Sequence, residues 1–333
     1  MPLPLSILDL AFVGAGETAR DALRGSVQLA QRAEASGYHR VWYAEHHNMR
    51  RIASSAPAVL IAHVAAQTRT IRLGAGGVML PNHSPLVIAE QFGTLAALHP
   101  GRIDLGLGRA PGGDANTFAA LRRDPGVAER FPDDVLELQA LLDGRSVGGV
   151  VATPSVEAGV PLYILGSSLF GARLAAALGL PYGFASHFAP AELTRAVALY
   201  RAEFQPSAAL NRPYVIAGVN VLAADTEAEA RAQLLRAQRL RVSVLLGGGR
   251  ELSDAEADAV LNSPRGSFLL DMMRYAAVGT PSMVRATLES FAQHADADEL
   301  ILALGGSTAA DRVHAAELVA EAWGLRPGEQ DAL

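Results

Sequence analysis

The sequence contains neither cysteine nor lysine, and each absence excludes a class of chemistry. Without cysteine the chain has no disulfide, no thiolate nucleophile and no thiolate ligands for zinc or iron–sulfur clusters. Because all 28 basic residues are therefore arginine, Schiff-base catalysis, lysine-anchored pyridoxal phosphate and the P-loop lysine are excluded as well.

Charged residues are also scarce, at 19% of the 333 residues, whereas 50% are hydrophobic. This balance predicts a large core, as in proteins whose sheet is covered on both faces. The formal net charge of −6 argues against a nucleic-acid partner, which would require clustered basic residues.

Long apolar runs are missing too, because no stretch approaches the roughly 18 residues that a membrane helix needs. Residues 1–15 are apolar, but the first basic residue is Arg20, so the positive start of a signal peptide is absent. We expect a cytoplasmic protein with no membrane partner.

Strand-like and helix-like segments alternate along the chain. Eight such units predict one α/β domain, a (β/α)8 TIM barrel spanning residues 1–333. Two segments break the alternation, an excursion at about 143–160 before the fifth strand and a lid-like insertion at about 247–275 between the seventh and eighth strands. The predicted strands are Leu5–Val13, His39–Ala44, Ile71–Val78, Ile103–Gly108, Leu162–Leu165, Tyr182–Ser186, Tyr214–Ala223 and Glu299–Ala303.

A glycine motif after the first strand offers a different interpretation. The segment from Gly14 to Ala19 fits the G-x-G-x-x-A pattern of dinucleotide-binding folds, and Glu45 could then bind a ribose hydroxyl. Such a fold explains the first units of the chain but not eight regular ones, so the barrel is preferred.

Barrel enzymes build their sites at the C-terminal ends of the strands. This rule places Glu45, His46, His47, His83 and His187 on one rim. A carboxylate beside an imidazole can orient it for proton transfer, and the same types of residue can bind a metal. Consecutive strand residues point to opposite faces, which disfavours one metal held by both neighbouring histidines. A purely structural role, with one histidine packed and one solvated, stays open.

The same rim carries two features suited to an anion. Gly166, Ser167 and Ser168 precede a predicted helix, whose free N–H groups could bind a phosphate, although serine is also an ordinary helix cap. Arg109 lies among glycines, and its guanidinium could clamp a phosphate or form a salt bridge at the rim.

Taken together, five segments resemble the bacterial luciferase-like flavin monooxygenase superfamily, and the closest resemblance is to its group 1 oxidoreductases. They occur in the order found in that family and span nearly the whole chain. The segments are Val41–Asn48, Gly76–Pro85, Gly101–Arg109, Leu165–Ser168 and Val278–Pro281.

The resemblance implies a monooxygenase that binds reduced FMN. On the flavin, O2 would form a C4a-hydroperoxide that oxidises a small organic substrate. His46 would be the catalytic histidine, and we expect Glu45 and His83 to act with it.

The resemblance also implies a cofactor site. Gly77, Val78 and Met79 would lie against the isoalloxazine ring, in a loop where relatives often have a non-proline cis peptide. Arg109, with the Gly166–Ser168 turn, would bind the phosphate. No resident metal is expected.

Three expectations concern partners and motion. A separate reductase would supply the reduced flavin, as in two-component systems. The apolar helix at Pro57–Gln67 predicts a homodimer. The glycines 247–249 could hinge a lid over the site, or the insertion could be a plain surface feature.

Other functions remain open on the sequence alone. An F420-dependent reductase or dehydrogenase of the same superfamily would transfer hydride without O2. A metal-dependent barrel hydrolase could use Glu45, His46 and His83. A non-catalytic flavin-binding protein is the third alternative. The substrate itself cannot be derived from the sequence.

Overall fold

The computed structural model describes residues 3–14, 16–110, 115–154, 159–247, 250 and 252–328. Within these ranges nine strands form one parallel sheet, in the order β6-β5-β4-β3-β2-β1-β9-β7-β8. The strands are β1 (Leu5–Asp9), β2 (Arg40–Tyr43), β3 (Arg72–Met79), β4 (Ile103–Gly108), β5 (Leu162–Gly166), β6 (Tyr182–Phe184), β7 (Val215–Ala223), β8 (Ala276–Gly279) and β9 (Glu299–Leu304).

Pairing of β6 with β7 closes the sheet into a barrel of eight strands, so the predicted (β/α)8 fold is confirmed. The ninth strand, β8, pairs only with the C-terminal half of β7 and was not predicted. The first strand ends at Asp9 rather than at Val13. A positive φ of 46° at Ala11, whose N–H donates to the Asp9 carboxylate at 2.8 Å, turns the chain there.

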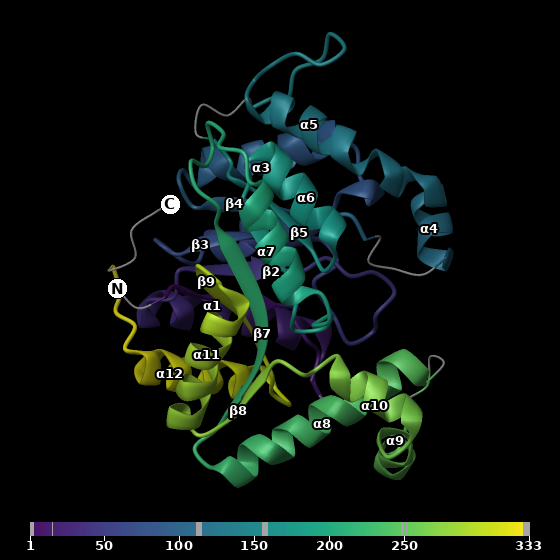
Figure 1. Ribbon diagram of the computed structural model, residues 1–333, viewed down its shortest axis with the longest axis vertical. Helices are drawn as coiled ribbons and strands as arrows, with labels where there is room; N and C mark the ends of the chain where they lie inside the picture. Colours follow the sequence, from purple (N-terminus) through teal and green to yellow (C-terminus); the bar gives the residue numbers. More distant parts are fainter. Residues whose placement is uncertain are drawn as a thin grey trace.

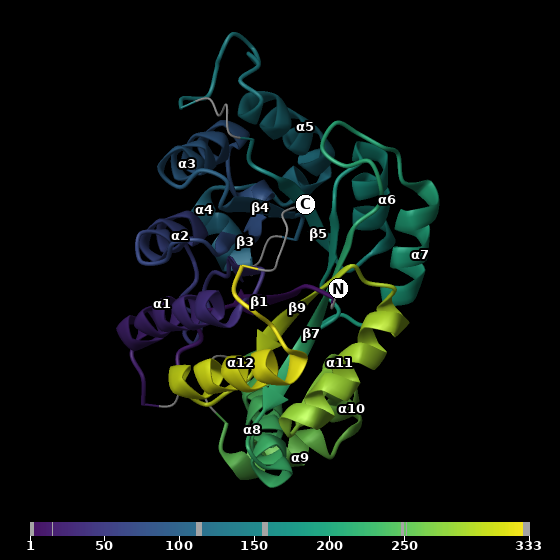
Figure 2. The same ribbon diagram turned by 90° about the vertical axis from the view of Figure 1, so that its left-hand side faces the viewer.

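Helices surround the barrel on its outside (Figures 1 and 2). Nine of the helices in the described ranges lie where the sequence pattern predicts helices, whereas α4, α9 and α10 were not predicted. The predicted helices are Thr18–Ser36, Pro57–Gln67, Pro85–Leu98, Pro132–Leu142, Ser168–Leu178, Pro190–Phe204, Thr226–Leu245, Pro281–His294 and Ala309–Trp323. The helices are α1 (Ala19–Ser36), α2 (Pro57–Ala65), α3 (Pro85–Leu98), α4 (Ala115–Leu121), α5 (Phe131–Leu142), α6 (Leu169–Leu178), α7 (Leu193–Glu203), α8 (Glu227–Leu246), α9 (Asp254–Leu261), α10 (Pro264–Asp271), α11 (Pro281–Ala295) and α12 (Ala309–Trp323), with 3-10 turns η1 (Leu80–Asn82) and η2 (Pro125–Arg130). No helix in these ranges is long and apolar enough to cross a membrane.

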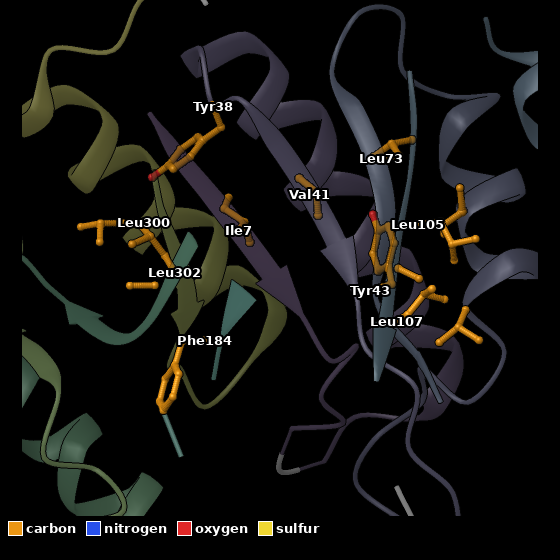
Figure 3. Packing of buried hydrophobic residues seen from close by; sticks show 14 of the residues in the cluster. Ile7, Tyr38, Val41, Tyr43, Leu73, Leu105, Leu107, Phe184, Leu300 and Leu302 are labelled. Carbon is orange, nitrogen blue, oxygen red and sulfur yellow. The ribbon is translucent and has the colours of Figure 1, made fainter. Parts of the chain in front are cut away.

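Alternating strand residues divide the core into two layers. Outward side chains such as Ile7, Val41 and Leu73 pack against the helices, as Figure 3 shows. Inward residues, Leu8 and Trp42 among them, fill the inside of the barrel. This period-two division predicts which face each residue beyond a strand end will take.

A buried ion network fills the N-terminal end of the barrel. Arg40 is fully buried, and its guanidinium contacts Asp104 Oδ2 at 2.8 Å and Glu299 Oε1 at 3.0 Å. Arg72 also pairs with Asp104, and the Tyr214 hydroxyl donates to Glu299 at 2.8 Å. The network joins strands on opposite sides of the barrel, far in the sequence from one another.

The insertion between β7 and the last strand is largely helical. Helices α9 and α10 pack on α8 through Val242, Ala257 and Leu269. Both views place α8, α9 and α10 together at the end of the molecule opposite α5 (Figures 1 and 2). Of the glycines expected to act as a hinge, Gly248 and Gly249 lie outside the described residues, so the lid stays a prediction.

Candidate active site

Glu45 is the centre of a hydrogen-bonded cluster just beyond β2. Its side chain is fully buried, and one oxygen accepts from His47 Nε2 at 2.8 Å and lies 2.9 Å from His83 Nε2. The other oxygen accepts from the Met79 N–H at 3.0 Å. Burial acts to raise the pKa of Glu45, but the bonds from His83, His47 and Met79 outweigh it, so the pKa lies below the usual value.

His46 continues the inward positions of β2, after Trp42 and Ala44. Its Nδ1 is buried and has no hydrogen-bond partner. Burial, opposed by Glu45, lowers the pKa of His46, so the imidazole is neutral near pH 7. A neutral imidazole with a free ring nitrogen can accept a proton from, or donate a hydrogen bond to, a bound ligand.

His187 lies beyond β6 on the same rim. A Cβ at Gly218 of β7 would overlap its Nδ1, so the ring lies directly over that glycine. This Nδ1 is also buried without a partner. Burial, with Arg241 and His46 nearby, lowers the pKa of His187 to about 3. Asn220 fixes the loop by donating to the His187 carbonyl at 2.6 Å.

The floor of the site is lined by glycine, and we call it the glycine-lined floor. Leu165 lies across it. An added Cβ would approach the Leu165 methyls within 2.7 Å at three of these glycines, and at Gly76 it would come within 2.9 Å of Leu8 and Trp42. The glycines leave room for Leu165, Leu8 and Trp42 to pack inside the barrel, so the layer beneath His46 and His187 is apolar. The floor comprises Gly76, Gly77, Gly106, Gly183 and Gly218.

The candidate anion site expected from the sequence begins one residue after Leu165. Gly166 and Ser167 lead into α6, whose N-cap Ser168 is exposed and makes no side-chain cap bond. The guanidinium of Arg109 stacks 4.3 Å from the ring centroid of Phe170 in the first turn of the same helix. Arg109 also donates to the carbonyl of Ala128 at 3.1 Å. The structure thus brings Arg109 to the α6 N-terminus, where free N–H groups favour a phosphate.

The residues expected against a flavin ring lie on β3. The peptide between Gly76 and Gly77 is cis, at the start of the expected loop. Val78 is 1% exposed and packs outward against the helices, so only its backbone can face a ligand. Met79 lies beside Gly108, with its sulfur 3.2 Å from where a Cβ would be.

The metal-site alternative finds no support in the geometry. His47 and His83, not His46, share the Glu45 carboxylate. Among the residues described, no three His, Asp or Glu side chains form a group that could hold a metal ion.

One polar residue of the rim was missed by the sequence reasoning. Arg241 of α8 has a buried Nη1 with no partner, and it acts electrostatically on His187. Helix α8 contains several arginines in a largely polar sequence, so no local signal distinguishes this one. His187 was placed on the rim by the strand-end rule but not given a role.

The barrel thus carries an apolar floor, a candidate phosphate site and unpartnered imidazoles at the C-terminal ends of its strands, where barrel enzymes build their sites. A family model described as luciferase-like monooxygenase matches residues 3–298. The chain belongs to this luciferase-like monooxygenase family, which supports a monooxygenase role.

Relatives match over most of the chain. A luciferase-like monooxygenase of Escherichia coli (strain K12) is 47% identical over 304 residues, which are 90% of this chain and 91% of that protein. An N-acetyl-S-alkylcysteine monooxygenase of Bacillus subtilis (strain 168) is 39% identical over 270 residues, 78% of this chain and 79% of that one. The crystal structure of apo-MsnO8 has a TM-score of 0.89 and 37% identity, covering 98% of this chain and 99% of that chain.

Two more distant structures share the fold alone. The oxygenating constituent of 3,6-diketocamphane monooxygenase from Pseudomonas putida, in complex with FMN, has a TM-score of 0.71 at 17% identity, over 98% of this chain and 99% of that one. An F420-dependent secondary alcohol dehydrogenase has a TM-score of 0.69 at 16% identity, over 99% and 100%.

Proposed function

We propose that the protein is a monooxygenase that uses reduced FMN and O2 to oxidise a small organic substrate at the barrel mouth. One observation carries this proposal. Leu165 lies across the glycine-lined floor, and the anion site at Arg109 and α6 begins at the next residue. A ligand with a flat apolar ring and a phosphate needs an apolar surface for the ring and, beside it, an anion site for the phosphate.

The unpartnered polar atoms of the rim fit such a ligand. Buried polar groups are nearly always hydrogen-bonded, yet His46 Nδ1, His187 Nδ1 and Arg241 Nη1 have no partner within the described structure. A cofactor or substrate with polar edges would complete their bonding. The cofactor-bound relatives of the same fold, one with FMN and one with F420, support a flavin-type group.

The residues of the site then take separate roles. When bound, reduced FMN supplies the two electrons that activate O2. Glu45 holds His83, His47 and the Met79 N–H in place, and thereby fixes the loop after β3. His46, neutral and free at Nδ1, holds or moves a proton at the reacting atoms.

We further propose that a separate reductase supplies the reduced flavin. The fold relative from Pseudomonas putida is itself the oxygenating constituent of a larger system. Purified protein is expected not to oxidise NADH or NADPH with FMN present, as followed at 340 nm. Direct oxidation of either nucleotide would contradict this part of the proposal.

Anaerobic calorimetric titration with reduced FMN and with reduced F420 tests the cofactor. We expect reduced FMN to bind more tightly, and Arg109→Gln to weaken it by about tenfold or more, the usual effect of losing a hydrogen bond to a charged group. Arg173→Gln is the control, because this exposed arginine lies on α6 itself but away from the N-terminus that Arg109 approaches.

The same titration decides between the alternatives. Binding of F420 in place of FMN would assign the protein to the hydride-transferring branch of the fold. If neither cofactor binds, the proposed function is wrong. O2 uptake with reduced FMN and N-acetyl-S-methylcysteine, chosen because of the Bacillus relative, then tests oxygenation directly.

A further inference from the structure

Among the arginines of α8, Arg241 alone has a buried nitrogen without a partner in the described structure. Its Nη1 makes no hydrogen bond to any described residue. The other arginines of this helix are satisfied: Arg239 pairs with Asp258 at 2.6 Å, and Arg236 donates to Ser307 at 2.9 Å. A buried guanidinium N–H without a partner destabilises a fold, and a ligand that accepts from this nitrogen would remove that cost.

The guanidinium of Arg241 lies near His187. The guanidinium and the His46 imidazole both lie close enough to His187 to depress its pKa, in addition to burial. The His187 ring in turn lies over Gly218 on the floor of the mouth. The guanidinium of Arg241 therefore lies near the two unpartnered imidazoles.

The charges around this space do not balance. Both imidazoles are neutral near pH 7, because burial lowers their pKa values. Glu45, a carboxylate of the rim, already accepts bonds from His47, His83 and the Met79 N–H. Arg241 thus brings a positive charge that no described carboxylate neutralises.

We propose that Arg241 binds the carboxylate of an acidic organic substrate at the barrel mouth. The inference deepens the proposed monooxygenase function and rests on it. The planar guanidinium can donate two parallel hydrogen bonds to the two oxygens of a carboxylate. Such bidentate pairs are strong and fix the orientation of the bound group. The phosphate of a flavin has a separate site at Arg109 and α6, which leaves Arg241 for the substrate.

Two matched pairs of probes test this assignment, N-acetyl-S-methylcysteine with its carboxamide, and butyrate with butyramide. Calorimetric titrations of the full-length protein, with and without reduced FMN under anaerobic conditions, give their dissociation constants. We expect each acid to bind more tightly than its amide. Arg241→Gln should weaken the binding of the acids by about tenfold to a hundredfold and leave the binding of the amides unchanged.

Two further variants control for charge and for helix stability. Arg241→Lys retains the charge without the planar fork and should give an intermediate loss. Arg231→Gln removes an exposed arginine of the same helix, paired with Glu227, and should match the wild type. Circular dichroism checks that each variant folds.

Three results would overturn the assignment. The first is that the wild type binds neither acid better than its amide. The second is that Arg241→Gln keeps the full preference for acids. The third is that Arg241→Gln weakens the binding of reduced FMN while the preference for acids persists. Arg241 would then interact with the flavin and not with the substrate. Failure of reduced FMN to bind, with an acid preference that depends on Arg241, would instead reject the proposed function and keep the carboxylate site.

Discussion

A single carboxylate, Glu45, determines how the rim beyond β2 is arranged. It accepts bonds from His47, His83 and the Met79 N–H while fully buried. Glu45→Gln keeps the shape of the side chain. Its amide NH2 group, however, replaces one acceptor oxygen and faces other N–H donors. We expect a loss of about 1–3 kcal/mol in the free energy of unfolding at pH 7, measured in urea. Glu289→Gln, on an exposed helix face, should change it little.

The same substitution has a pH signature. The pKa of Glu45 is lowered in the folded protein, so its contribution is fully present above the unfolded value of about 4.3 and is lost as pH falls through the folded pKa. The gap between wild type and Glu45→Gln should therefore narrow below about pH 4. A gap that widens in acid would contradict the hydrogen-bonding scheme.

His187 makes the free energy of unfolding depend on pH in a second range, below about pH 6.5. Its pKa of about 3 in the fold lies below the unfolded value of about 6.5, so acid protonates the unfolded chain first and stability falls below pH 6.5. At pH 5.5 the loss from this group is about 1.4 kcal/mol relative to neutral pH. His187→Asn should remove that part of the decline, as urea unfolding at pH 7.5 and 5.5 would show.

At the scale of single residues, the sequence predicted positions better than roles. The strand-end rule placed Glu45, His46 and His83 on the rim, where they lie. The alternation of faces puts Glu45 and His47, two residues apart, on the same side of the chain, but their hydrogen bond was not predicted. Arg241 was missed because its partner-free nitrogen is a property of packing and not of its neighbours in sequence.

Among the elements, the strands of the floor allow no side chain at their glycines. A Cβ at Gly106 would overlap the backbone oxygen of Ala75 on the adjacent strand, which cannot move without breaking the sheet. Gly106→Ala should cost about 1–3 kcal/mol in unfolding free energy. Gly126→Ala, where a Cβ meets nothing within 4 Å, is the control. Equal stability of the two variants would show that the floor tolerates side chains.

The elements that the sequence predicted best are those with caps or long periodic runs. Helix α1 begins at Thr18 with an Asp21 capping box and ends at Gly37 in the left-handed region, and it was predicted within a residue. Strand β8 has only four residues, Ala276–Gly279, of which Val278 alone favours a strand, too little for a signal. Helices α9 and α10 obtain their core from α8, a long-range contact that local sequence does not reveal.

For the whole molecule, the network at Arg40 joins the ends of the barrel strands. Arg40→Met would leave Asp104 and Glu299 buried without their common partner. Breaking a buried ion pair from one side typically costs about 3–5 kcal/mol, and we expect that loss in urea unfolding. Arg32→Met, which breaks an exposed pair with Glu317, should cost less than about 1 kcal/mol.

Assembly is a further property of the whole molecule. We propose a homodimer through α2, whose Val59 is 71% exposed although the helix is apolar around most of its surface. Light scattering at micromolar concentration should give twice the mass of the chain, and Val59→Glu should reduce it. A monomeric wild type would contradict this proposal.

The inner layer of the barrel also contains a natural optical reporter. The chain has two tryptophans: Trp42 lies against Gly76 beneath the floor, and Trp323 is on α12, donating to the Leu3 carbonyl. A flavin above the floor would absorb at the wavelengths where indole emits, so excitation would pass to it from Trp42 first. The emission of Trp323→Phe should therefore be quenched on oxidised FMN binding more completely than that of the wild type.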